Sequence, residues 1–342
     1  MEKTNYSQLY QKLTKGLSPK TKEIFDRRFG VKTGQAETLE SIGKSLDITR
    51  ERVRQIEEAG FNFVKKQNKD LLEKTFAELA SYFEKNGGFK KEEVALEELG
   101  GKKHKPYILF LLTLGEQFSR VCEKKDFYSF WSTMQSPESN VKATLASLVS
   151  DIESKKTPVN KGEFLSTFAS KNSLKNEVLN SYFELSKQIK ENKDGKIGLM
   201  SWPEINPRGV KDKAFLVFKK HGKPLHFTKV AELIDDLEDS ASDKKTYPQT
   251  VHNELIKDAR FVLVGRGTYA LSEWGYFPGT IKDIIVKILE NKQEPINRED
   301  LVKEVLTQRF VAKNTVLMNL NNKKYFDKDD SGKYLLRKTQ SA

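Results

Sequence analysis

The side chains with the clearest chemical purpose lie in one stretch, residues 38–55, which reads TLESIGKSLDITRERVRQ. Its second half places four polar side chains on one helical face. They are Arg50, Glu51, Arg54 and Gln55. Arginine can pair with guanine and glutamine with adenine, and a glutamate can accept a hydrogen bond from cytosine N4. The set therefore points to the reading of base edges in duplex DNA.

Two short helices must position these side chains. Apolar residues recur at helical spacing before and after the interruption at residues 47–49. They are Ile42 and Leu46 on the first helix and Val53 and Ile56 on the second. Thr49 is a good N-cap because its hydroxyl can accept a hydrogen bond from a free backbone N–H. The pattern is typical of a helix-turn-helix, whose second helix enters the major groove N-terminus first.

A solvated charged helix would also carry many polar residues. Here the cap, the apolar spacing and the base-reading residue types coincide in one stretch, which favours DNA reading over simple solvation.

Residues 17–66 resemble region 4 of bacterial sigma-70-type transcription initiation factors. The resemblance begins at Leu17-Ser18-Pro19 and is most specific in the run DITRERVRQIE. It also includes Ile24-Phe25, residues 27–30, Thr38-Leu39-Glu40 and Ile42-Gly43. In that family the recognition helix reads the −35 promoter element.

The resemblance implies a role for each matching polar residue. Arg50, Glu51, Arg54 and Gln55 would face bases, and Thr38 and Arg52 would sit near phosphate. We expect Lys44 to help hold the backbone and Thr49 to cap the reading helix. The chain departs from the family after Glu57, where basic residues are usual, because it continues with Glu58 and the segment 60–63, GFNF. Thr21 also stands where the family often has an acidic residue.

The composition favours a polyanionic partner. The chain has 342 residues, with 60 Lys and Arg against 48 Asp and Glu, a net charge of +12. Such a surplus is typical of proteins that bind nucleic acid, although excess lysine can also serve solubility. The single cysteine, Cys122, allows no internal disulfide. The N-terminus has no signal-peptide core, and the apolar run 107–114 is too short to span a bilayer. We therefore expect a cytoplasmic protein without a membrane partner.

The chain beyond residue 69 repeats one plan of helix, break, second helix, third helix and aromatic hairpin. The breaks fall at residues 88–91, 158–161, 224–227 and 295–298. This plan is that of a winged helix. Breaks that recur at nearly regular intervals along the chain indicate a repeated supersecondary unit. We predict a mainly α protein with small β-hairpins, a helix-turn-helix domain followed by tandem winged helices. The expected domains are 1–69, 70–135, 141–205, 209–276 and 279–338.

The unit at 209–276 resembles the HARE helix-turn-helix domain, a winged-helix family found in the delta subunit of bacterial RNA polymerase. The matching residues are His226-Phe227, Thr250-Val251, Leu255 and the hairpin 265–271 that ends at Trp274. A polar loop, residues 238–245, separates its second and third helices. Arg266 lies at the hairpin turn, where it could follow a phosphate or a minor groove, or simply be solvated.

Catalytic and metal chemistry find no support in the sequence. The histidines lack cysteine partners and metal-binding spacing, and the Asp-Gly turns lack further acidic ligands. No nucleophile–base set and no paired carboxylates can be proposed. We therefore expect no enzyme activity, no cofactor and no small-molecule substrate.

The sequence predicts a sequence-specific DNA-binding transcription factor that acts with the core of bacterial RNA polymerase on promoter-like duplex DNA. Few residues precede the region-4-like stretch, so we expect an accessory regulator that cannot initiate transcription alone. The alternative is a polymerase-associated scaffold whose winged helices bind protein and which has little DNA affinity of its own.

Overall fold

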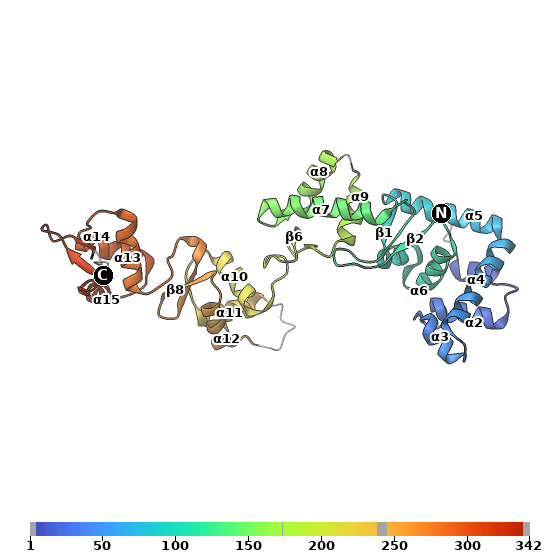
Figure 1. Ribbon diagram of the computed structural model, residues 1–342, viewed down its shortest axis with the longest axis horizontal. Helices are drawn as coiled ribbons and strands as arrows, with labels where there is room; N and C mark the ends of the chain where they lie inside the picture. The colour runs from blue at the N-terminus through green and yellow to red at the C-terminus, as the bar shows by residue number, and fades with distance from the viewer. Residues whose placement is uncertain (1–4, 173, 238–244, 338–342) are drawn as a thin grey trace, which may run out of the picture. The chain divides into compact units, whose positions relative to one another are not determined.

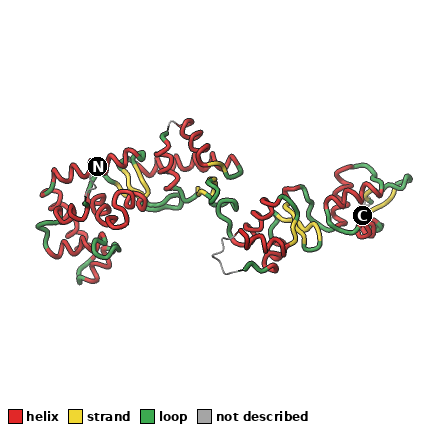
Figure 2. Tube along the Cα trace, turned by 180° about the vertical axis from the view of Figure 1, so that it is seen from behind, coloured by secondary structure: helices red, strands yellow, loops and turns green. Residues whose placement is uncertain are grey.

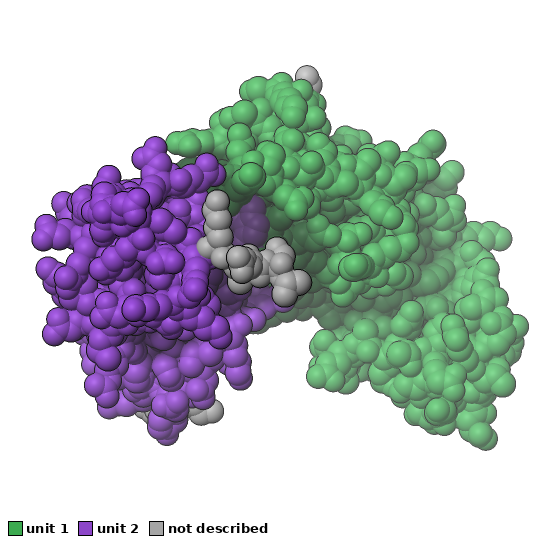
Figure 3. Space-filling view, turned by 60° about the vertical axis from the view of Figure 1, so that its left-hand side comes forward, with its two compact units in different colours: residues 1–201 green, residues 202–342 purple. Residues whose placement is uncertain are grey.

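The computed structural model describes residues 5–172, 174–237 and 245–337, and helices account for most of them (Figures 1 and 2). The strands are short and form small antiparallel sheets. The chain divides into two compact units, residues 1–201 and 202–342 (Figure 3). The expected fold class, mainly α with small β-hairpins, is confirmed.

The predicted helix-turn-helix lies within four N-terminal helices. These are α1 (Tyr6–Leu13), α2 (Pro19–Phe29), α3 (Leu39–Ser45) and α4 (Arg50–Gln67). Each begins where a side chain satisfies a free backbone N–H. Asn5, Ser18, Thr38 and Thr49 cap the four helices in turn. The side chains of Ile24, Ile42 and Val53 are fully buried and join α2, α3 and α4 in a small core.

A winged-helix plan follows twice within the first compact unit. The first copy comprises α5 (Lys69–Lys85), β1 (Phe89–Lys91), α6 (Glu92–Leu114), β2 (Ser119–Val121) and β3 (Phe130–Ser132). The second comprises α7 (Pro137–Lys155), β4 (Val159–Asn160), α8 (Lys161–Asn172), α9 (Asn176–Leu185), β5 (Ile189–Glu191) and β6 (Lys196–Leu199). In α6 the backbone at Gly101 leaves helical geometry, so the second and third helices expected there meet end to end.

The second compact unit contains two further copies. The third copy comprises α10 (Gly209–His221), β7 (Leu225–His226), α11 (Phe227–Leu237), α12 (Pro248–Lys257), β8 (Phe261–Gly265) and β9 (Thr268–Leu271), with η1 (Ser272–Trp274) after it. The fourth comprises α13 (Ile281–Lys292), α14 (Arg298–Gln308), α15 (Lys313–Leu320), β10 (Phe326–Lys328) and β11 (Tyr334–Leu336). Each copy closes its own apolar core. The polar loop expected at residues 238–245 lies, apart from Lys245, outside the described residues.

The breaks before the second helices are short strands. In the first three copies this strand pairs with the last strand of the hairpin, giving sheet orders β1-β3-β2, β4-β6-β5 and β7-β9-β8. In the fourth copy Ile296 makes the equivalent antiparallel bridge to Tyr334. The repeat in the sequence predicts the helices and hairpins, whereas these short strands are visible in it only as interruptions. The five domain boundaries remain predictions.

Among the described residues, every helix is too short or too polar to span a lipid bilayer.

Candidate nucleic-acid interface

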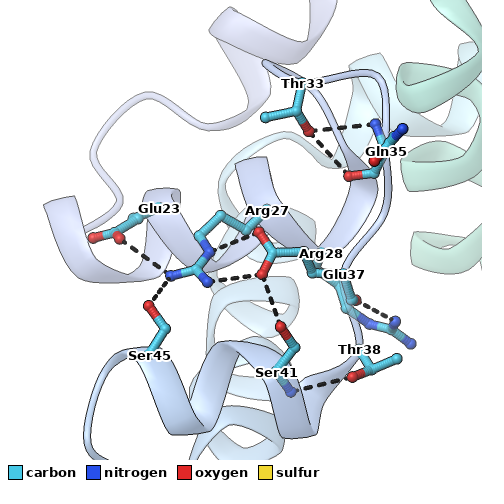
Figure 4. A network of polar contacts seen from close by, with 9 residues as sticks. All are labelled: Glu23, Arg27, Arg28, Thr33, Gln35, Glu37, Thr38, Ser41 and Ser45. Atoms are coloured by element: carbon cyan, nitrogen blue, oxygen red, sulfur yellow. Dashed lines mark hydrogen bonds and ion pairs between the residues drawn. The ribbon is translucent and has the colours of Figure 1, made fainter.

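A polar network on α2 fixes the first helix of the helix-turn-helix (Figure 4). Arg27 of α2 donates two hydrogen bonds to the carboxylate of Glu37, from Nε at 2.9 Å and from Nη2 at 2.7 Å. Its Nη1 reaches Ser45 Oγ in the last turn of α3 at 2.9 Å, while Ser41 in the first turn donates to Glu37. Arg27 thus holds the last turn of α3 through Ser45, and Glu37 holds its first turn through Ser41. The bidentate pair between Arg27 and Glu37 fixes the geometry of this network, because such pairs add geometric specificity as well as energy.

The turn between α3 and α4 passes very close to α3. A Cβ at Gly43 would lie 2.7 Å from the carbonyl oxygen of Ile48, so any larger residue would push the turn away. Asp47 adopts a left-handed backbone conformation (φ 52°), which aspartate tolerates better than most residues. Thr49 Oγ1 then accepts the backbone N–H of Arg52 at 3.1 Å, as the cap predicted for α4. The turn therefore sets the start of α4 firmly relative to α3.

The exposed face of α4 carries the predicted reading residues. Val53 is fully buried, while the four side chains expected to face bases are all exposed, as is Arg52. Those four residues are Arg50, Glu51, Arg54 and Gln55. The face of α4 opposite its buried side is therefore polar and open from its first turn onward.

Arg54 is held by two carboxylates of its own helix. Its Nη2 lies 2.8 Å from Glu51 Oε1, and its Nη1 lies 3.0 Å from Glu58 Oε2. The hydrogen bonds from Arg54 hold the pKa of the Glu51 carboxyl below its ordinary value. Arg52 donates to Gln55 Oε1 at 3.2 Å. A bidentate contact of the Arg54 guanidinium with a base would compete with these two carboxylates.

The opposite side of α4 is held to α2 by a buried acid. The Glu57 side chain is 11% exposed, and its Oε1 lies 3.4 Å from Arg28 Nε, an ion pair without a well-formed hydrogen bond. Arg28 also donates to the backbone oxygen of Glu37 at 3.0 Å. Burial raises the pKa of the Glu57 carboxyl, and the nearby Arg28 partly opposes that shift.

The C-terminal half of α4 serves packing. The ring of Phe61 lies 5.0 Å from that of Phe25 and 6.0 Å from that of Phe110, measured between centroids, and is tilted against both. Phe110 belongs to α6 and also meets Tyr10 of α1 at 5.0 Å and Phe29 of α2 at 5.3 Å. One apolar core therefore runs from the helix-turn-helix into the first winged-helix copy. The GFNF segment, where the related family usually has basic residues, supplies part of this core.

The remaining predicted residues take separate places. Thr38 caps α3, its Oγ1 accepting the backbone N–H of Ser41 at 3.1 Å. Lys44 pairs with Glu40 at 3.5 Å, with both side chains exposed. Arg266 is exposed at the β8–β9 turn and belongs to the second compact unit, whereas α4 belongs to the first.

Three further residues shape the site, although the sequence analysis gave them no role in it. They are Glu57, Glu58 and Phe110. The i,i+4 spacing of Arg54 and Glu58 is a signal for an ion pair along a helix, and it was readable from the sequence. The contact of Phe110 with Phe25 joins residues far apart in the chain, and no local spacing predicts it.

Comparison with known proteins agrees with this geometry. Residues 15–66 match the family model for sigma-70, region 4. Residues 208–274 match the HARE-HTH family model, a helix-turn-helix domain whose description names ASXL and restriction endonucleases. Both resemblances inferred from the sequence are confirmed. The two matches indicate a DNA-binding protein that acts in transcription and has a helix-turn-helix like that of sigma factors.

Curated relatives match the same N-terminal segment. The chain is 46% identical over 46 residues to RNA polymerase sigma factor SigA of Clostridium acetobutylicum, covering 14% of this chain and 12% of that protein. It is 33% identical over 66 residues to SigA of a Nostoc species, covering 19% and 17%. For sigma factor sigB of Arabidopsis thaliana the identity is 36% over 59 residues, covering 17% and 10%. The chain therefore spans less than a fifth of the length of each of these relatives.

The described residues contain no group of three or more His, Cys, Asp or Glu side chains arranged to hold a metal ion.

Proposed function

We propose that this protein is a sequence-specific DNA-binding regulator that acts in the cytoplasm with bacterial RNA polymerase during transcription initiation, and that α4 is its reading helix. The observation that carries the proposal is the exposed polar face of α4. Arg50, Glu51, Arg54 and Gln55 all point away from buried Val53, and a helix of this kind enters the major groove with its first turns leading.

Contact with DNA would divide these side chains by role. Arg50 and Arg54 would pair with guanine and Gln55 with adenine, because these bidentate contacts match the donors and acceptors of the base edges. Glu51 would accept from cytosine. Thr38, Lys44 and Arg52 would lie against phosphate, and Thr49 would keep the first turn of α4 in place. Phosphate contacts set position and base contacts set specificity.

The polymerase partner is inferred from the relatives, which are RNA polymerase sigma factors. The similarity covers only the reading segment, so we propose an accessory role beside polymerase and not a full initiation factor. The winged-helix copies that follow give the chain further surfaces for DNA or protein.

Selection of bound duplexes from a random pool tests the reading role. We expect the intact chain to enrich one motif and the double variant Arg50→Ala/Arg54→Ala to lose it. The matched control is Lys20→Ala/Lys22→Ala, which removes the same charge from exposed positions on α2 of the same region. Enrichment of an unchanged motif by the Arg50/Arg54 variant would show that α4 does not read bases.

Transcription reconstituted with purified core polymerase tests the accessory role. With core and this protein alone we expect no promoter-specific transcripts. When a sigma factor is also present, we expect the protein to change the yield from templates that carry the selected motif. Promoter-specific transcripts from core and this protein alone would establish a complete initiation factor instead.

The second candidate function is a protein-binding scaffold on the polymerase. It is favoured by the ion pairs at the helix-turn-helix, where Arg27, Arg54 and Lys44 are all engaged by carboxylates of the protein itself. Contact with several phosphates makes affinity fall steeply as salt rises. A weak affinity that barely changes with salt would therefore support the scaffold.

A further inference from the structure

The basic surplus of the chain is concentrated at its two ends. Residues 1–69 hold 15 Lys and Arg against 9 Asp and Glu, and residues 277–342 hold 13 against 9. The long middle, residues 70–276, is nearly balanced at 32 against 30. The α4 helix-turn-helix accounts for the first end, and the fourth winged-helix copy carries the other.

Within the fourth copy the charge is divided between its elements. Residues 281–308, which contain α13 and α14, hold five basic and six acidic residues. Residues 309–337, which contain α15 and the hairpin, hold seven basic and three acidic residues. The segment 310–326 has no acidic residue at all. The positive charge of this copy therefore belongs to α15 and its flanks.

The cations beside α15 are free of carboxylates. Lys313, at the start of α15, and Lys323 and Lys324, just beyond its end, are exposed, and none forms an ion pair within the described residues. Along α13, α14 and the segment between them, two of the five cations are paired, Lys282 with Asp283 and Lys292 with Glu304, and six acidic residues lie among the five. Unpaired lysines at both ends of a helix are placed to neutralise phosphates that flank it.

Arg309, the other cation near α15, is not part of this surface. It is buried and donates to the backbone oxygens of Phe277, Gly279 and Gln308. Burial lowers the pKa of this guanidinium. Its role is to hold the segment that enters the fourth copy.

The face between the lysines is uncharged. Asn314, Met318 and Asn321 follow one another at helical spacing and are all exposed, the Met318 side chain at 74%. Val316 and Leu320 face the core on the other side. Asparagine can form two hydrogen bonds with adenine, and an apolar group can contact the thymine methyl. The exposed Met318 therefore offers an apolar contact for base edges in the major groove.

We propose that α15 and the adjoining segment 321–324 form a second contact with double-stranded DNA, with α15 in the major groove and Lys313, Lys323 and Lys324 on the flanking phosphates. This contact goes beyond the proposed reading role of α4, because it lies in the other compact unit and uses none of the same residues. The major groove of B-form DNA admits a helix, whereas that of an RNA duplex is too narrow, so the surface fits DNA.

The hairpin limits the extent of the contact. Asp327 lies in β10, and Asp329 and Asp330 lie in the following turn, where Asp329 Oδ1 accepts backbone N–H groups of Ser331 and Lys333 at 3.0 and 2.9 Å. These three acids are matched by three cations of the same hairpin, Lys328, Lys333 and Arg337, so the hairpin adds no net positive charge. The contact is therefore carried by the helix and its two ends.

One cation from the third copy lies close to this surface. Gly265 bridges to Phe310, whose backbone N–H donates to Val264 O, and Phe310 precedes Lys313 by three residues. The exposed Arg266 follows Gly265 directly. The backbone pairing therefore brings the third wing near the N-terminal end of α15, where Arg266 can add a phosphate contact.

A salt titration of full-length protein binding to a mixed-sequence duplex tests the proposal. The variant Lys313→Gln/Lys323→Gln/Lys324→Gln removes three predicted phosphate contacts. Each contact contributes about 0.9 to the slope of log K against log salt, so we expect the slope to become shallower by about 2.7. The matched control Lys287→Gln/Arg298→Gln/Lys303→Gln removes the same charge from exposed positions on α13 and α14. We expect the control to change the slope by less than about one.

Equal slope changes in the two triple variants, or no change in either, would overturn the proposal. So would a triple α15 variant that keeps its slope but no longer binds core polymerase, since the surface would then dock protein. Thermal unfolding of both variants checks that the fold is intact. Failure of the α4 proposal is seen separately, because Arg50→Ala/Arg54→Ala changes the selected motif, whereas the α15 variant changes the salt slope on any sequence.

Discussion

The helices α4 and α15 hold equivalent places in two helix-turn-helix units, yet their charges are arranged in opposite ways. On α4 the exposed Arg54 is shared between Glu51 and Glu58. Beside α15 the lysines at 313, 323 and 324 have no carboxylate partner among the described residues. Both surfaces are basic by count, but the cations on them differ in how they are paired.

The difference teaches that net charge alone does not measure affinity for phosphate. An exposed ion pair contributes little because water screens it, so Arg54 can leave its carboxylates at a correct base at small cost. At a wrong site the same arginine gains little by leaving. We therefore expect α4 to supply discrimination and α15 to supply affinity that does not depend on sequence.

The two helices also differ in what supports them, and the largest predicted effect follows from this. The Phe110 side chain of α6 is fully buried among the rings of Tyr10, Phe25, Phe29 and Phe61. Truncation of a buried phenylalanine to alanine typically costs about 3–5 kcal/mol. We expect Phe110→Ala to reduce the free energy of unfolding by that amount and to increase hydrogen exchange along α4 as well as α6.

The matched control is Leu289→Ala in α13, a buried position in the separate core of the fourth copy. It should destabilise α15 and leave exchange in α4 unchanged. If Phe110→Ala raised exchange only in the winged-helix copy, α4 would not depend on this aromatic core.

The second predicted effect separates base reading from phosphate contact on α4 itself. Arg54→Ala should cost about 1–3 kcal/mol at the selected motif and relax specificity at one base pair. Arg52→Ala should weaken binding to all sequences alike and make the salt slope shallower by about one. Fluorescence anisotropy with the selected duplex and single-base variants of it measures both. A uniform loss for Arg54→Ala would place that guanidinium on phosphate and erase the proposed contrast with α15.

Much of the α4 site followed from local signals in the sequence. The spacing of Ile42 and Val53 predicted the two buried faces, and Thr49 predicted the cap, because helix periodicity and capping act within a few residues. The repeat likewise predicted the helices and hairpins of the winged-helix copies. These features are local, so the sequence was sufficient for them.

Other features depend on residues that meet only in the folded chain. In the sequence the strand at residues 89–91 looks like a break between helices. Its partner, β3, lies about forty residues later, and three residues are too few to reveal the alternation of side chains that is typical of a strand. The contact of Phe61 with Phe110 has the same origin. The unpaired state of the lysines beside α15 required the positions of every nearby acid. Composition gave the surplus but not its distribution between paired and free side chains.

The third prediction changes the pairing on α4 toward the arrangement beside α15. Glu58→Gln removes one carboxylate from Arg54 and a negative charge from the DNA-facing side. Because an exposed ion pair contributes little, we expect affinity for every duplex to rise by about 1.4-fold to fivefold. The control Glu84→Gln changes the same charge at an exposed position on α5. Titration of each protein with duplex DNA at fixed salt measures the affinity. An unchanged affinity for Glu58→Gln would mean that Glu58 does not restrain Arg54.

The smallest predicted effect concerns the buried acid that clamps α4. Burial raises the pKa of Glu57, so near its ordinary value of 4.5 and just above it the folded chain holds this proton more tightly than the unfolded chain. The contribution of Glu57 to stability therefore falls as the pH rises through that window and levels off above its folded pKa. Carboxyls with a lowered pKa, such as Glu37, contribute in the opposite direction, so the effect must be isolated by difference.

Urea unfolding of the intact chain and of Glu57→Gln across pH 4 to 7 provides that difference, since an amide cannot titrate. We expect the stability of the intact chain relative to the variant to decrease as the pH rises. A relative stability that instead increases with pH would show that the attraction of Arg28 outweighs burial. In that case α4 would be held by a favourable ion pair between Glu57 and Arg28. Glu57 would then differ from Arg309, a buried cation of the fourth copy, whose partners are backbone oxygens and whose pKa burial lowers.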